Sequence, residues 1–70
     1  MKHLYRKAFA HEFEAQETAK GFFKMPGIDK LGAPEVSTAH EDGKHYVYVA
    51  LEGDVDPAEV LAATGYERVS

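Results

Sequence analysis

The dipeptide Asp42-Gly43 separates two runs of strand-forming residues, and it constrains the fold of this chain more than any other feature. A two-residue turn with positive φ at both positions favours Asp-Gly, because the twist of that turn matches the twist of the flanking strands. The sequence therefore predicts a β-hairpin with strands over residues 35–41 and 45–52. In this register Glu41 lies opposite Lys44, which is a favourable pair of opposite charges.

The two faces of this hairpin differ in chemistry, because successive side chains on a strand point to opposite faces. The face predicted to cover the core is mostly aliphatic and carries Val36, Thr38, His40, His45, Val47, Val49 and Leu51. The other face is amphipathic and carries Ser37, Ala39, Tyr46, Tyr48 and Ala50. Tyrosine is enriched in protein interfaces, and small residues beside it let another surface approach closely. We therefore predict an interface made of Ala39, Tyr46, Tyr48 and Ala50, with ordinary solvated strand residues as the alternative.

The chain has 70 residues and no cysteine, which limits how it can be stabilised. A single domain of this size, here residues 1–70, builds a small hydrophobic core, and small domains often need a further stabilising device. Disulfides and thiolate metal sites are excluded. Close packing, a histidine or carboxylate metal site, and self-association remain, and we expect a homodimer.

The longest uninterrupted apolar run is 46–51, far short of the roughly 20 residues that span a bilayer. The first residues, Met1, Lys2 and His3, do not begin an apolar signal-peptide segment. We therefore expect a soluble cytoplasmic protein with no membrane partner.

The formal net charge is −4, and it is unevenly distributed. Residues 1–34 have a balance of +2, whereas residues 35–70 have a balance of −6. An acidic domain repels phosphate backbones, so we expect no nucleic-acid partner and predict that the partner is another protein. The acidic half also allows an alternative function, an inhibitor that blocks a basic site on its partner.

The rest of the chain reads as two helices and two further strands. Residues 3–13 fit a strand or a helix, and the strand is preferred because a third neighbour would cover one edge of the hairpin. Residues 14–24 are predicted to be a helix that buries Ala19, Phe22 and Phe23. A second helix is predicted to start with Asp56 as its N-cap and Pro57 in its first turn, and to end at Gly65. Residues 66–69 then form a short last strand.

This order, βαββαβ, is typical of the ferredoxin-like split, an α+β fold with an antiparallel sheet and two helices on one face. In that topology the first and third strands are neighbours in the centre of the sheet. The alternative is α-β-β-α-β, in which residues 3–24 form one long N-terminal helix.

Three histidines form the candidate metal site. In the split topology the end of the first strand lies near the hairpin tip, so His11 could approach the cross-strand pair His40 and His45. Three imidazoles are a suitable ligand set for zinc or nickel, which makes a metal- or ligand-sensing domain an alternative function. The other interpretation is three partly exposed histidines at one end of the sheet, with no cofactor.

Motifs for catalysis are missing from the sequence. The two serines are Ser37 in the hairpin and Ser70 at the end of the chain, and the glycines lack the spacing of a phosphate-binding loop. We therefore expect a small non-catalytic, regulatory protein-interaction module.

Overall fold

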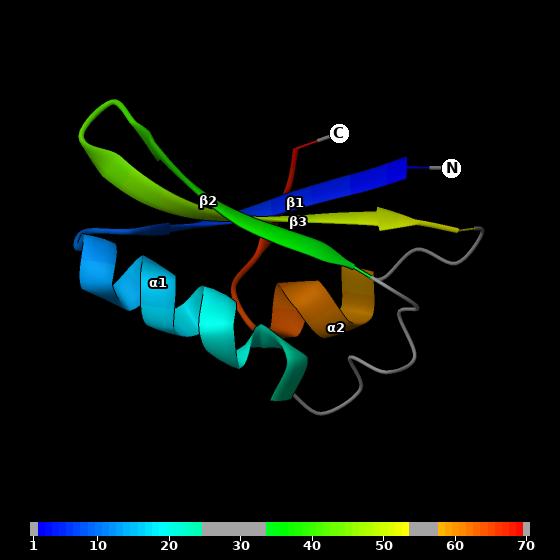
Figure 1. Cartoon of the computed structure of the whole chain (residues 1–70). Coiled ribbons are helices and arrows are strands. Elements are labelled where there is room, and N and C mark those ends of the chain that lie inside the picture. The colour runs from blue at the N-terminus through cyan, green and yellow to red at the C-terminus, as the bar shows by residue number, and fades with distance from the viewer. Residues whose placement is uncertain (1, 25–33, 54–57, 70) are drawn as a thin grey trace.

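The computed structural model describes residues 2–24, 34–53 and 58–69, except for the side chain of Val60. It has the α+β architecture, with a four-stranded antiparallel sheet and two short helices. The elements are β1 (Lys2–Phe9), α1 (Glu12–Gly21), the 3₁₀ turn η1 (Phe22–Lys24), β2 (Glu35–Glu41), β3 (Lys44–Glu52), α2 (Ala58–Ala63) and β4 (Glu67–Arg68). The strand order is β2-β3-β1-β4, and both helices lie on the same side of the sheet (Figure 1).

The β2–β3 hairpin confirms the prediction made from Asp42-Gly43. Both turn residues have positive φ, 50° for Asp42 and 77° for Gly43. The register follows the predicted pairs from Glu41 opposite Lys44 outward. On the predicted core face Val47 and Val49 are fully buried.

β1 settles the ambiguity at the N-terminal end of the described chain, and the alternative with one long helix over residues 3–24 is wrong. β1 pairs with β3 along its whole length, from Lys2 opposite Glu52 to Phe9 opposite His45. Tyr5 is buried on the helix-covered face of the sheet. Local helical periodicity is overridden because pairing and burial in a sheet outweigh intrinsic propensity.

The predicted boundary between the first strand and the first helix is wrong by several residues. The strand ends at Phe9 rather than at residue 13, and His11 precedes α1 in an extended conformation (φ −124°, ψ 140°). Glu12 and Glu14 occupy the first turn of α1, where the helix dipole favours negative charge. This shift places Phe13 on the helix, where it is 71 % exposed.

The buried face of the first helix also differs from the prediction. Ala15 and Phe22 are buried and Ala19 packs against the core, but Phe23 is 59 % exposed. Phe22 and Phe23 both lie in η1, and adjacent residues on a helical turn project in different directions, so both rings cannot enter the core.

The second helix ends as predicted, at Gly65, which has a φ of 91°. The backbone N–H of Tyr66 donates to the Leu61 carbonyl at 3.0 Å, and the Gly65 N–H donates to the Ala62 carbonyl at 3.1 Å. These two bonds define a Schellman motif, in which a hydrophobic contact often links the residue after glycine to the last turn. Leu61 and Tyr66 are both buried in the core. The predicted start of this helix, Asp56 and Pro57, lies outside the described residues.

β4 follows directly and is shorter than the predicted strand over 66–69. It pairs Glu67 with Arg6 and Arg68 with Tyr5.

The core between the sheet and the helices consists of Tyr5, Ala15, Phe22, Val47, Val49, Leu51, Leu61 and Tyr66.

Tyr66 leads to a prediction about alkaline pH. Burial raises the pKa of the Tyr66 phenol, and its hydroxyl has no hydrogen-bond partner among the described residues. The folded state therefore favours the neutral phenol, and this contribution to stability is present below the unfolded pKa of about 10 and is lost as pH rises through the raised folded value.

We expect Tyr66→Phe to match or exceed the wild type in stability at pH 8, by up to about 1 kcal/mol, because it removes an unpaired buried hydroxyl. The variant should also lose less stability between about pH 8 and pH 11. Urea unfolding at the two pH values measures both effects. Parallel losses in the two proteins would contradict the assignment.

Candidate functional site

The four residues predicted as an interface lie together on the side of the sheet that faces away from the helices. Tyr46 on β3 is opposite Ala8 on β1 and Ala39 on β2. Ala50, two pleats along β3 on the same face, completes the set. We call this side of the sheet the open face, and Figure 1 shows both described helices on the opposite side.

A polar network crosses the open face from one edge strand to the other. Arg6 on β1 donates through Nε to Glu67 Oε1 on β4 at 2.7 Å, and through Nη1 to the Tyr48 hydroxyl on β3 at 3.4 Å. The Tyr48 hydroxyl in turn donates to Glu41 Oε2 on β2 at 2.9 Å. The Glu67 carboxylate, and then the Tyr48 hydroxyl, raise the pKa of Arg6 above its ordinary value, so the guanidinium is a permanent positive charge.

Arg6 also covers Tyr46, which explains why this tyrosine is only 9 % exposed although the described helices lie on the other side of the sheet. The Arg6 Cζ atom lies 4.6 Å from the centroid of the Tyr46 ring, a cation–π distance. Tyr48 is partly exposed, and its ring centroid is 6.0 Å from that of Tyr46. Of the two predicted interface tyrosines, Tyr46 is therefore buried within the monomer, whereas Tyr48 is partly exposed at its surface.

The predicted three-histidine cluster is only partly assembled. His40 and His45 lie opposite each other on the hairpin, with parallel rings whose centroids are 4.4 Å apart. His11 is exposed immediately before α1. In the part of the chain that the structure describes, no three His, Asp or Glu side chains are grouped closely enough to hold a metal ion. Because the chain leaves β1 at Phe9 and turns into α1, the structure does not bring His11 together with the pair.

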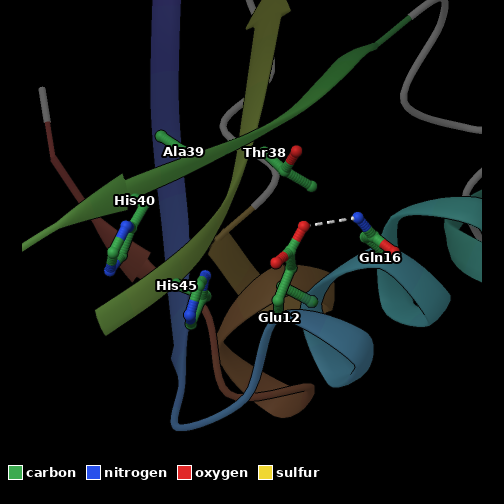
Figure 2. Close-up of a pocket in the computed structure, with 7 residues that line it drawn as sticks. Glu12, Gln16, Thr38, Ala39, His40 and His45 are labelled. Carbon is green, nitrogen blue, oxygen red and sulfur yellow. Dashed lines mark hydrogen bonds between the residues drawn. The ribbon is translucent and has the colours of Figure 1, made fainter. Parts of the chain in front are cut away.

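The histidine pair borders a groove of about 270 Å³ between the hairpin and the start of α1 (Figure 2). The groove is lined by Glu12, Ala15, Gln16, Thr38, Ala39, His40 and His45. The Glu12 carboxylate projects into it and accepts a hydrogen bond from Gln16 Nε2 at 2.9 Å. The lining therefore combines imidazole nitrogens, a hydroxyl and a carboxylate at an accessible surface.

Arg6, Glu41 and Glu67 are site residues that the sequence analysis did not identify. Strand alternation alone could have placed Glu41 on the open face with the tyrosines, and Arg6 on the face of β1 opposite to Tyr5. Their contacts depend on how β1 and β4 align with the hairpin, which has no local sequence signal. Phe13 was also missed as an exposed residue, because the predicted strand extended through it.

Comparison of the chain with protein-family models, with curated proteins and with solved structures found no match. Among the described segments, no helix has the length and apolar character needed to cross a membrane.

Proposed function

We propose that this protein is a non-catalytic protein-interaction module that acts as a homodimer through the open face of its sheet. The observation that carries the proposal is the one-sided arrangement of the fold. The core lies between the sheet and the helices, whereas the open face presents Tyr48 within a charged network. Tyrosine and arginine are the residue types most enriched at the energetic centres of interfaces.

The distribution of charge on the open face supports pairing with a second copy. The positive Arg6 side chain is 32 % exposed and lies between the carboxylates of Glu41 and Glu67, which are 52 % and 62 % exposed. A two-fold axis places the same patch of each subunit against the other. Neighbouring charges of both signs let Arg6 of one copy approach a carboxylate of the other, which offsets at short range the repulsion between two chains of net charge −4.

We also propose that the topology is the ferredoxin-like split. The antiparallel pairing of β1 with β3 in the centre, the edge positions of β2 and β4, and the two helices on one face support this assignment. The fold by itself carries no function, so the functional proposal depends on the open face.

The decisive experiment is sedimentation equilibrium of the wild type and two variants over a roughly hundredfold range of concentration. Tyr48→Asp removes the exposed aromatic ring from the proposed contact and adds a carboxylate beside Glu41, so it should convert the dimer to a monomer. Phe13→Asp makes a comparable change on an exposed aromatic residue of α1, away from the open face, and should leave the dimer intact. Circular dichroism checks that each variant is folded.

A wild type that stays monomeric at the highest concentration would overturn the homodimer, as would a dimer that Phe13→Asp disrupts and Tyr48→Asp does not. If the monomer instead binds a basic protein and loses that binding in salt, the chain is an acidic inhibitor.

A further inference from the structure

The histidine pair lies on the helix-covered side of the sheet, near the hairpin tip, and the proposed dimer does not use it. We propose that His40 and His45 form a two-imidazole chelate for a divalent transition-metal ion of the zinc class. The observation behind this proposal is the position of the two rings, which are parallel within 7° and have centroids 4.4 Å apart.

The hairpin positions this pair in advance. Directly opposite residues on antiparallel strands have Cβ atoms about 4.5–5.5 Å apart, and the Asp42-Gly43 turn sets their register. Zinc binds imidazole nitrogen at about 2.0–2.1 Å, so two nitrogens on one tetrahedral ion lie about 3.3 Å apart. In the parallel stack the nitrogen lone pairs do not converge, so the chelate requires side-chain rotations that turn one nitrogen of each ring toward a common point.

The surroundings of the pair suit a hydrated cation. His40 is exposed and His45 is partly exposed, so the ion can enter from solvent and keep water in its remaining positions. Glu12 projects into the same groove from α1 and supplies a negative charge (Figure 2). The Glu12 carboxylate accepts a hydrogen bond from Gln16, so Glu12 stabilises a bound cation by its negative charge. It can coordinate the ion directly only after a change of rotamer.

The donor chemistry predicts selectivity. Imidazole suits zinc and its neighbours among the transition metals, whereas magnesium and calcium prefer sets of oxygen ligands. The test ion is therefore Zn²⁺, added to a chain without a polyhistidine tag, with Mg²⁺ as the comparison ion.

Isothermal titration with Zn²⁺ measures affinity and stoichiometry in the wild type, His40→Gln, His45→Gln and the matched control His11→Gln. We expect one ion per chain. Either variant of the pair should weaken binding by about tenfold or more, because each removes one of two ligands. His11→Gln should bind within about twofold of the wild type, since His11 is not part of the chelate. Glu12→Gln should reduce affinity less than either histidine variant does.

Side-chain NMR gives a second readout. Zn²⁺ should shift the imidazole signals of His40 and His45 and leave those of His3 and His11 in place. The melting temperature should rise with Zn²⁺ concentration in the wild type, and His45→Gln should need at least about tenfold more Zn²⁺ for the same rise, because an ion bound only to the folded state stabilises it.

Several results would overturn the chelate. They are equal weakening by His11→Gln, comparable binding of Mg²⁺, and half an ion per chain, which would place the ion between two copies. The Tyr48→Asp variant should bind Zn²⁺ as the wild type does, so this proposal and the homodimer can fail independently.

Discussion

Replacing Phe22 with alanine is expected to lower the free energy of unfolding by about 3–5 kcal/mol. The Phe22 ring has no exposed surface and meets the Tyr66 ring edge to face at a centroid distance of 6.0 Å. It therefore connects the end of the first helical segment to the segment that follows α2. A domain of this length has a total stability of roughly 4–10 kcal/mol, so the change should remove between about a third of that stability and all of it.

Phe13→Ala is the matched control for this experiment, because it makes the same chemical change on the same helical segment. Phe13 is 71 % exposed, so its replacement should change stability by no more than about 0.5 kcal/mol. Both variants are compared by urea unfolding at one protein concentration, since self-association would add to apparent stability. Similar losses in the two variants would mean that Phe22 is not the anchor of this segment.

Gly43→Val is expected to be the most damaging single change in the hairpin, with a cost of about 1–2 kcal/mol or more. Gly43 has a φ of 77°, and an added Cβ would meet no atom within 4 Å, so the cost is conformational rather than steric crowding by neighbours. A β-branched residue strongly resists positive φ. The loss should spread along β2 and β3, because the turn sets the register of both strands.

Gly43→Asn tests the cause of that cost. Asparagine tolerates the left-handed region, so this variant should be clearly more stable than Gly43→Val. Thermal unfolding of both variants, with amide exchange along β2 and β3, measures the difference. Equal destabilisation would mean that positive φ at residue 43 is not what the turn requires.

The hairpin could be predicted from sequence because all of its determinants are local. The Asp42-Gly43 turn determines the register. The alternation of apolar residues determines the buried face, as the full burial of Val47 and Val49 shows. The composition of the predicted interface follows from the same alternation. The end of α2 is equally local, since Gly65 supplies the positive φ that closes a Schellman motif.

Element boundaries were harder to predict, because a shift of a few residues changes which way each side chain points. Phe13 was assigned to a strand face and lies exposed on α1, and Phe23 was assigned to the core and is mostly exposed. Apolar residues are abundant in both segments, so composition could not choose which rings are buried. Packing buries Phe22 and Ala15 in the cluster that also contains Tyr5 and Tyr66, and leaves the rings of Phe13 and Phe23 at the surface.

The residues of the candidate sites also differ in whether local sequence or tertiary contacts position them. The sequence by itself determined the β-hairpin, its register, the face that carries Tyr46 and Tyr48, and the opposition of His40 to His45, because these features arise within 18 consecutive residues. Only the tertiary structure decided that residues 2–9 are a strand, that Arg6 covers Tyr46 and binds Glu67, and that His11 stays apart from the pair. The first two outcomes depend on contacts between segments that are far apart in the sequence, as in the Arg6–Glu67 pair with a separation of 61 residues, and the third depends on where β1 ends. The energies of such contacts come from pairing and burial and leave no periodic signal in either segment alone.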